Sequence, residues 1–244
     1  MSHQGTIWER EYRDSKLVTK DSKPQADVLR FLKFLKKVAS SATHREGGKE
    51  YTKTRKYSIR GKNILDLGCG TGRNSNYLAE RGNNVIGIEI SKTAISLAKE
   101  RAKESLLNVD YRLGGIGEKY DIKDNTIDLV LDVTSSNSLD EKGRKVYLEE
   151  VNRVLKNSGY FFVRALCKGG DQNAKILLKE SPGGERDTYI IKEMGLTERV
   201  FSREDFITTY GKYFKILKLE KTSHYSTFNN RIYKRNYWLA YLKK

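Results

Sequence analysis

The feature that most constrains the fold is a short apolar segment that runs directly into a glycine-rich turn. The segment covers residues 63–67, and Gly68, Gly70 and Gly72 follow it. Glycines at alternate positions let the backbone turn tightly and let a ligand lie against it, while a helix starting next presents free N–H groups. The pattern predicts a strand, a ligand-binding turn and a helix over residues 73–80.

The central part of the chain repeats this alternation of strand and helix. Helices are expected over residues 92–106, 141–155 and 202–213. Strands are expected over residues 63–67, 84–88, 109–113, 127–131, 160–165, 214–220 and 237–242. Strands that alternate with helices of this length pair in parallel through right-handed crossovers. We therefore expect an α/β fold with a doubly wound, mostly parallel seven-stranded sheet that binds ligands at the carboxyl ends of its strands.

The segments outside this region have a different character. Ile7, Trp8 and Tyr12 begin an expected N-terminal helical extension, and apolar residues recur every three or four positions after Pro24. Residues 40–60 are polar, charged and contain two glycines, so we expect an exposed, disordered loop. Residues 168–200 have weak periodicity and form an expected insertion after the fifth strand. The resulting division is a helix and basic loop over 1–60 and a single domain over 61–244.

The positive charge of the chain is concentrated in its two flanks. The formal net charge is +16, of which residues 1–60 carry +8, residues 61–165 carry +1 and residues 166–244 carry +7. Clustered positive charge attracts polyanions or acidic substrates. Lysines scattered over solvated helix faces would give the same total. RNA therefore stays open as a partner.

Composition argues against several classes of protein. No apolar run approaches the roughly 20 residues that a membrane span needs, and the first residues are too polar for a signal peptide. We therefore expect a cytoplasmic protein with no membrane partner. The two cysteines, Cys69 and Cys167, are too few for a disulfide framework, and no cysteine or histidine spacing suggests a metal site.

Two acidic residues stand at the ends of the first two expected strands. Asp66 directly precedes the glycines, where it is badly placed beside a pyrophosphate and well placed to receive an ammonium group. Glu89 ends the second strand, where a carboxylate can accept both hydroxyls of a ribose. The pair suggests an aminoacyl-nucleoside ligand. The alternative is that both acids only cap the helices that follow them.

The turn and the next strand resemble a known family. Residues 63–72, NILDLGCGTG, and residues 85–91, VIGIEIS, are similar to the first two motifs of the class I, Rossmann-like S-adenosylmethionine-dependent methyltransferases. The similarity extends over residues 62–165. Residues 72–79, GRNSNYLA, and residues 8–12, WEREY, also resemble the tellurite-resistance and thiopurine-type small-molecule methyltransferases.

The resemblance implies S-adenosyl-L-methionine as the cofactor. The glycine turn would hold its methionine part, Glu89 its ribose, and Ile90 its adenine. Many members hold the adenine amine with an acid after the third strand, but here a glycine stands at that place, so backbone groups near Gly115 and Ile116 are expected instead. The implied cofactor contacts are Asp66, Gly68, Cys69, Gly70, Thr71, Gly72, Asn74, Glu89, Ile90, Gly115, Ile116 and Asp132.

Methyl transfer from a sulfonium is an in-line displacement that depends mainly on alignment and exclusion of water. A nucleophile that starts protonated also needs a base. Candidate catalytic groups at the strand ends are Asp132, Arg164 and His224. The candidate substrate and lid residues are Ser135, Asn137, Tyr225, Trp8 and Tyr12.

Each candidate also has a purely structural interpretation. Asp132 could cap the turn that follows it, and Arg164 could form an ordinary ion pair. His224 could be an exposed loop residue. Trp8 and Tyr12, which share a helical face, could form an ordinary packing stripe.

Three functions are compatible with these features. The first is an S-adenosylmethionine-dependent methyltransferase, an enzyme acting on a small molecule or metabolite. The second is the same chemistry on RNA or another macromolecule, bound through the basic flanks. The third is a non-catalytic S-adenosylmethionine-binding protein. The chain lacks an Asn/Asp-Pro-Pro-Tyr sequence after the fourth strand, which argues against methylation of a nucleobase nitrogen.

Overall fold

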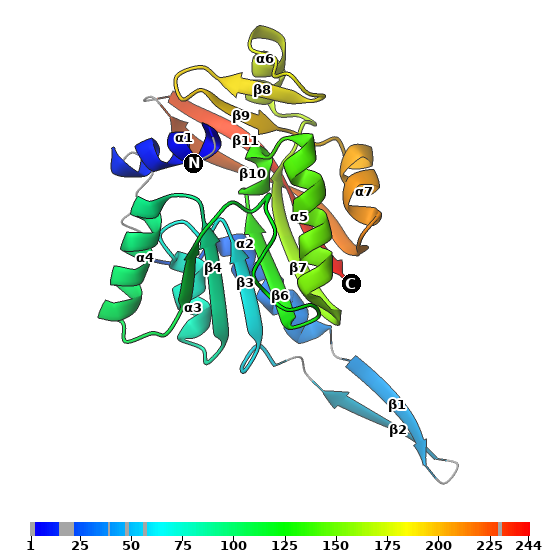
Figure 1. Cartoon of the computed structure of the whole chain (residues 1–244). Helices are drawn as coiled ribbons and strands as arrows, with labels where there is room; N and C mark the ends of the chain where they lie inside the picture. Colours follow the sequence, from blue (N-terminus) through cyan, green and yellow to red (C-terminus); the bar gives the residue numbers. More distant parts are fainter. Residues whose placement is uncertain (1–2, 15–21, 39, 47–48, 56–57, 229–230) are drawn as a thin grey trace.

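A computed structural model describes residues 3–14, 22–38, 40–46, 49–55, 58–228 and 231–244 (Figure 1). Its centre is a seven-stranded sheet with the strand order β10-β11-β7-β6-β3-β4-β5. The strands are β3 (Asn63–Leu67), β4 (Asn84–Glu89), β5 (Asp110–Leu113), β6 (Ile127–Val133), β7 (Leu155–Leu166), β10 (Lys215–Phe228) and β11 (Arg231–Lys243). β3 to β7 pair in parallel, whereas β11 is antiparallel to both β7 and β10. The expected mostly parallel, seven-stranded sheet is confirmed.

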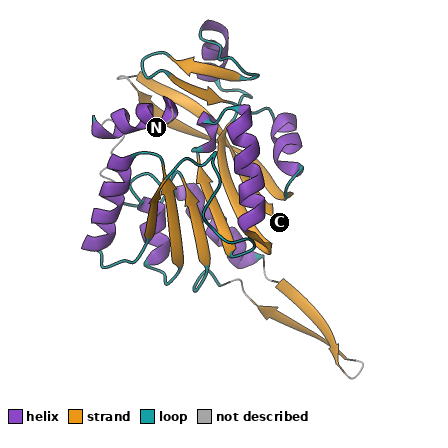
Figure 2. Ribbon diagram, viewed as in Figure 1, coloured by secondary structure: helices purple, strands orange, loops and turns teal. Residues whose placement is uncertain are grey.

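Helices cover both faces of this sheet, because its central strands are apolar on both sides (Figure 2). In β3, residues 64–67 are all buried. One face packs against α2 (Ala26–Lys37) and α3 (Arg73–Ala79), and the other against α5 (Glu141–Val154) and α7 (Arg203–Gly211). α4 (Lys92–Glu104) connects β4 to β5. The sequence predicted these helices because apolar residues recur along each buried face.

The stripe of apolar residues on α2 forms the core of one face. Phe31 is fully buried, and its ring lies 5.2 Å from that of Phe162 on β7 and 5.0 Å from that of Tyr241 on β11. Gln25 caps the helix, since its side chain accepts hydrogen bonds from the backbone N–H groups of Asp27 and Val28. The N-terminal extension is therefore part of the main core through α2.

The polar segment before the sheet differs from expectation. Instead of a disordered loop, the structure has two antiparallel strands, β1 (Ser40–Glu46) and β2 (Lys49–Arg55), paired from Ser40 opposite Arg55 to Glu46 opposite Lys49. This hairpin projects away from the sheet (Figure 1). Backbone pairing needs no apolar alternation, which is the signal on which strands are predicted from sequence. Residues 47–48 and 56–57 of the expected loop lie outside the described residues.

The expected insertion after the fifth strand contains regular structure. It consists of α6 (Gln172–Glu180) and the antiparallel pair β8 (Thr188–Ile191) and β9 (Leu196–Arg199). Asp171 caps α6 by accepting a hydrogen bond from the backbone N–H of Ala174. The remaining elements are α1 (His3–Arg13) and a short 3-10 helix, η1 (Ser136–Ser138), after β6. Within the described residues, no helix has the length and apolar character needed to cross a membrane.

The packing of α2 on the sheet leads to a prediction. Phe162 is fully buried and stacks on Phe31, so Phe162→Ala should lower the free energy of unfolding by about 3–5 kcal/mol in chemical denaturation. The matched control is Leu106→Ala, because Leu106 is 94% exposed and should change stability by less than about 0.5 kcal/mol. Equal effects of the two substitutions would contradict this description of the core.

Candidate functional site

A cavity of about 690 Å³ lies at the carboxyl ends of β3, β4 and β6, the place expected for a ligand in a parallel sheet. Its walls come from α1, the glycine turn, the end of β4, the loop after β5, and the segment after β6. The lining residues are His3, Gln4, Trp8, Tyr12, Gly68, Cys69, Gly70, Thr71, Arg73, Asn74, Glu89, Ile90, Gly114, Gly115, Ile116, Gly117, Glu118, Val133, Thr134, Ser135, Ser138, Leu139, Asp140 and Gly143. The volume falls within the ~300–1,000 Å³ typical of small-molecule sites.

The glycine turn presents bare backbone to this cavity. Gly68 and Gly70 have φ angles of 66° and 55°, a conformation that favours glycine. A β-carbon on Gly70 would lie 2.8 Å from the Tyr12 hydroxyl, so the close approach of α1 also requires glycine there. The backbone N–H groups of Gly68 and Cys69 both donate to the carbonyl of Ile88, at 2.8 and 3.0 Å. The turn is therefore fixed to the end of β4.

Glu89 stands at the end of β4 and holds the turn from the other side. Its Oε2 accepts a hydrogen bond from the Gly70 N–H at 3.0 Å, and its Oε1 accepts one from the Ser91 N–H at 2.9 Å. Burial raises the pKa of this carboxyl, and the backbone hydrogen bonds act in the opposite direction. The Glu89 side chain is therefore a positioned acceptor on the cavity wall.

The structure puts Asp66 in a different position from the one expected. Its carboxylate is 1% exposed, does not line the cavity, and accepts a 2.6 Å hydrogen bond from the Ser75 hydroxyl on α3. Burial raises the pKa of Asp66 to about 6. Instead of facing an ammonium group, this acid ties the strand before the turn to the helix after it.

Asp132 likewise does not line the cavity. One of its carboxylate oxygens accepts from the backbone N–H groups of Ser135 and Ser136, and the other accepts a 2.6 Å hydrogen bond from the Tyr147 hydroxyl. The residue is fully buried, which raises the pKa of its carboxyl. These contacts correct the expected pocket role and match the alternative in which Asp132 caps the following turn.

Arg164 and His224 both contact the carboxylate of Asp27 on α2. The Arg164 guanidinium donates to Asp27 of α2 at 3.1 Å and lies 3.5 Å above the ring of Tyr237. His224 Nε2 lies 3.4 Å from the same Asp27 oxygen. Neither residue lines the cavity, so the expected catalytic positions of both are corrected. The buried Asp27 carboxylate, which no sequence pattern singled out, draws both side chains toward α2.

The other expected residues divide between the cavity and the structure around it. Asn137 links two segments, since its amide donates to the Thr134 carbonyl and accepts from the Leu166 N–H. Tyr225 is 74% exposed and lies off the cavity, as does Gly72. Expected residues that do line it are Trp8, Tyr12, Gly68, Cys69, Gly70, Thr71, Asn74, Glu89, Ile90, Gly115, Ile116 and Ser135.

α1 covers the cavity and is held on one side by α4 and on the other by the insertion. Glu9 accepts hydrogen bonds from the Ser91 hydroxyl at 2.8 Å and from the N–H and hydroxyl of Thr93 at 3.0 and 2.7 Å. These groups form the N-terminus of α4, where a carboxylate is favourable. On the insertion side, Ile7 packs against Met194, in the turn between β8 and β9, and against Leu196, the first residue of β9. α1 therefore spans from the insertion to the ligand-binding end of β4.

Burial raises the pKa of Glu9, but the hydrogen bonds from Thr93 and Ser91 and the nearby Arg13 outweigh it and lower that pKa to about 2. The carboxylate form therefore fits the docked position of α1 far better than the neutral acid does. Docking of α1 is an electrostatic contact as well as an apolar one.

Several wall residues were not predicted from the sequence. Glu118 lies directly against the backbone of the loop after β5, since a β-carbon on Gly115 would be 2.9 Å from its Oε1. It stands three residues beyond Gly115, close to the place where an acid is missing from the family pattern. Gln4 Oε1 and Ser138 Oγ are buried side-chain oxygens on different walls, and neither has a hydrogen-bond partner among the described residues. No sequence pattern distinguishes these two residues, but a polar ligand could satisfy both.

Comparison with known proteins gives matches to methyltransferases. Residues 64–159 match the family model described as a methyltransferase domain. The chain is 29% identical over 160 residues to the ubiquinone biosynthesis O-methyltransferase of Brucella ovis, covering 57% of this chain and 64% of that protein. It thus spans less than two thirds of the length of that relative. A methyltransferase of Schizosaccharomyces pombe is 30% identical over 107 residues, which are 44% of this chain and 73% of that one.

Solved structures share the fold. An S-adenosylmethionine-dependent methyltransferase from Methanosarcina mazei superimposes with a TM-score of 0.66 and 22% identity, over 77% of this chain and 94% of that one. TehB from Haemophilus influenzae superimposes with a TM-score of 0.63 and 18% sequence identity, over 97% of this chain and 67% of that one. A third structure is the 1,6-didemethyltoxoflavin-N1-methyltransferase of Burkholderia thailandensis, crystallised with 1,6-didemethyltoxoflavin and S-adenosylhomocysteine. It superimposes with a TM-score of 0.67 and 15% sequence identity, over 99% of this chain and 87% of that one. The resemblance drawn from the sequence is confirmed.

The docking of α1 leads to a prediction. Glu9→Gln should speed hydrogen exchange of the α1 amides at pH 7 by about 10- to 100-fold, because hydrogen bonds to a charged group are worth roughly 1.5–3 kcal/mol. The control is Glu104→Gln, an exposed acid on α4. Equal exchange of α1 in both variants would contradict the role of Glu9.

The same contact predicts a pH dependence. A free glutamate has a pKa of 4.5, and the docked Glu9 has a pKa of about 2. Ionised Glu9 therefore stabilises the docked position of α1 fully above pH 4.5, and this stabilisation is lost as the pH falls from 4.5 through 2. Protection of α1, corrected for intrinsic exchange rates, should therefore decrease between pH 4.5 and 2. Glu9→Gln should lack this dependence.

Proposed function

Because the chain belongs to the S-adenosylmethionine-dependent methyltransferases, we propose that it transfers a methyl group from S-adenosylmethionine to a small organic acceptor in the cavity beneath α1. The observation that carries this proposal is the covering of the ligand-binding end of the sheet by α1. Trp8 and Tyr12 of α1 form one wall of the cavity, with their rings 6.4 Å apart. A covered cavity of this size suits a small molecule better than a polymer.

The residues around the glycine turn are suited to the cofactor. In our proposal, its methionine part lies against the backbone of Gly68 and Gly70, which line the cavity and carry no side chain. Glu89 accepts from the ribose hydroxyls, since each of its oxygens has a further lone pair beyond its one backbone hydrogen bond. The bound cofactor supplies an activated methyl group on a sulfonium.

Glu118 is our proposed acceptor for the adenine amine. It follows β5, lines the cavity and lies against the backbone of Gly115. A carboxylate there would do what an acid directly after the third strand does in many family members. Ile90 and Ile116 provide the apolar surfaces that an adenine ring needs on its faces.

The acceptor part of the proposal depends on alignment more than on acid–base groups. Asp132, Arg164 and His224 are occupied elsewhere, so none of them is assigned to the acceptor. Alignment and exclusion of water can supply roughly 7–11 kcal/mol of a barrier. Gln4 Oε1 and Ser138 Oγ, which have no partner among the described residues, are our candidates for orienting a polar acceptor.

The names of similar proteins support a small acceptor. One relative is named for ubiquinone biosynthesis, one structural neighbour was crystallised with 1,6-didemethyltoxoflavin, and both of these compounds are small molecules. The basic flanks, which would favour RNA, are not the walls of this cavity: of the lysines and arginines that the structure describes, only Arg73 lines it. The neutral centre of the sequence supplies most of the lining.

The cofactor site gives a direct prediction. Glu89→Ala should weaken S-adenosylmethionine binding at least tenfold in calorimetry, since it removes a positioned charged acceptor. Glu118→Ala, on a more exposed residue, should weaken it by about three- to tenfold without loosening the turn. The control Glu100→Ala, an exposed acid on α4, should bind as the parent does. Unchanged affinity in both test variants would mean that the cofactor binds elsewhere.

The acceptor class is tested by label transfer. The chain is incubated with methyl-labelled S-adenosylmethionine and either a low-mass metabolite extract or total RNA. We expect label in the metabolite fraction, and its loss with Trp8→Ala, which removes part of the α1 wall while leaving the glycine turn intact. Label in RNA alone would overturn the small-molecule proposal, and cofactor binding without any transfer would point to a non-catalytic binder.

A further inference from the structure

A second cavity, of about 940 Å³, lies between the insertion and strands β10 and β11 of the sheet. Its walls come from the segment after β7, from α6, from the turn before β8, from the start of α7 and from β10 and β11. The lining residues are Cys167, Lys168, Gly169, Gly170, Asp171, Gln172, Lys175, Leu178, Lys179, Pro182, Gly183, Glu185, Asp187, Thr188, Ser202, Arg203, Glu204, Lys221 and Trp238. No described residue lines both cavities.

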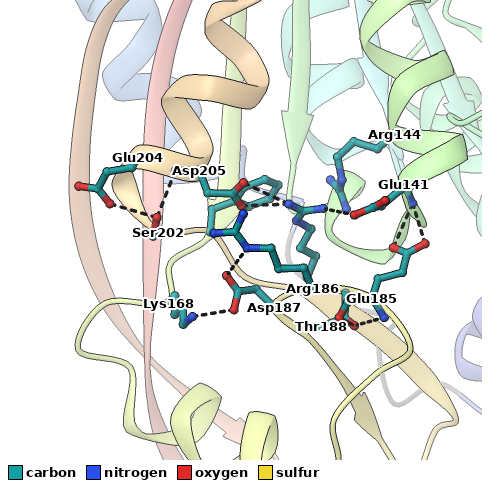
Figure 3. Close-up of polar contacts among 12 residues, drawn as sticks. Glu141, Arg144, Lys168, Glu185, Arg186, Asp187, Thr188, Ser202, Glu204 and Asp205 are labelled. Carbon is teal, nitrogen blue, oxygen red and sulfur yellow. Dashed lines mark hydrogen bonds and ion pairs between the residues drawn. The ribbon is translucent and has the colours of Figure 1, made fainter.

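The acids of this second cavity are already engaged by protein groups (Figure 3). Both carboxylate oxygens of Glu185 accept a hydrogen bond from the backbone N–H of Glu141, each at 3.0 Å. Asp187 is bound by Lys168 at 2.6 Å, and Glu204 accepts from the Ser202 hydroxyl at 3.1 Å.

The fourth acid, Asp171, is the most completely engaged. Its Oδ1 accepts from the Ala174 N–H at 2.9 Å, and its Oδ2 accepts from the Asn236 N–H at 2.8 Å. Arg235 lies 3.8 Å from the same Oδ2. All four described acids of the cavity therefore have a stated partner within the fold.

Most of the described cations that line the same cavity have no carboxylate partner. Lys175 and Lys179 stand four residues apart on α6, and Arg203 begins α7. The side chains of these three form no hydrogen bond or ion pair with another described residue. Lys221 reaches only the carbonyl of Gly169, at 3.4 Å. Five described cations and four described carboxylates line the cavity, so its lining carries a net charge of +1, and Lys175, Lys179 and Arg203 lack an ion-paired carboxylate.

One side of the cavity is apolar. Leu178 of α6, Pro182 and Trp238 of β11 line it. The indole N–H of Trp238 already donates to the Phe201 carbonyl at 2.9 Å, so the indole offers this cavity an apolar surface. A ligand with both a charged group and an organic body would use both parts of the wall.

We propose that this second cavity binds a phosphate-bearing small organic molecule. Three cations without an ion-paired carboxylate suit a group that carries about −1.5 to −2 charge, as a phosphate monoester does near pH 7, better than a single carboxylate. Lysine serves as a point-charge phosphate ligand, and arginine can bind two phosphate oxygens together. The apolar wall takes the organic part of the molecule.

The site is separate from the cofactor cavity but lies next to it. Glu185 lines the second cavity and accepts from the first N–H of α5, while Asp140, the N-cap of that helix, lines the first. The proposal does not depend on the acceptor assigned above, because it concerns a different set of residues.

The chain contains two tryptophans, and each of them lines one cavity. In a Trp8→Phe background, emission from Trp238 reports on the second cavity alone. We expect ribose 5-phosphate to give a saturable change in that emission, and calorimetry to give the same affinity. Lys175→Gln together with Lys179→Gln should weaken binding at least tenfold, because hydrogen bonds to charged groups are worth roughly 1.5–3 kcal/mol.

The matched control is Lys99→Gln together with Lys103→Gln, an exposed pair with the same spacing on α4. It removes the same charge and should change the affinity by less than twofold. Binding of S-adenosylmethionine, followed through Trp8 in a Trp238→Phe background, should be unchanged in both double variants. That measurement shows that the fold and the first cavity are intact.

Several outcomes would overturn the proposal. Absence of saturable binding would do so, as would equal weakening by the two lysine pairs, which would indicate only the overall charge. Equal affinity for ribose and ribose 5-phosphate would show that phosphate is not recognised. Tighter binding of a short single-stranded RNA that Lys175→Gln with Lys179→Gln abolishes would assign the cavity to a polymer surface.

Discussion

The ligand-binding end of the sheet depends on one carboxylate, that of Glu89. It accepts hydrogen bonds from the Gly70 N–H in the turn and from the Ser91 N–H before α4, and so it fixes the turn and the helix start relative to β4. The Ser91 hydroxyl in turn accepts from the Ala94 N–H and donates to Glu9 of α1. A chain of hydrogen bonds therefore leads from the glycine turn to the helix that covers the cavity. Because Glu89, Ser91 and Glu9 are all buried, loss of one would remove a hydrogen bond from a buried polar group of its partner.

The parts of the fold that the sequence predicted share a local signal. β3, α3 and β4 are encoded by apolar periodicity and by glycines whose spacing has a backbone cause, and both can be read within about 30 residues. The hairpin of β1 and β2 lacks that signal, because its pairing is made by backbone groups. The same holds for β8 and β9, in an insertion whose sequence has weak periodicity.

The site was predicted less well than the fold, because a position at a strand end does not determine where a side chain points. Asp66 and Glu89 stand at the ends of neighbouring strands. Asp66 is hydrogen-bonded to Ser75 on α3, whereas backbone N–H groups hold the Glu89 carboxylate at the cavity. Arg164 ends a strand at the crevice, but Asp27, 137 positions earlier in the chain, binds it. Contacts over such distances are set by packing and leave no local pattern.

The distribution of charge can be interpreted in terms of individual contacts. The C-terminal third has a formal charge of +7, which alone could indicate a nucleic-acid surface. Part of that charge is used internally: Arg199 pairs with Asp205 at 3.0 Å, and Arg235 lies between Glu198 and Asp171. The charge that remains includes Lys175, Lys179 and Arg203, which line one cavity. Since a polymer needs a row of cations at the spacing of its phosphates, three cations around one cavity favour a compact anion.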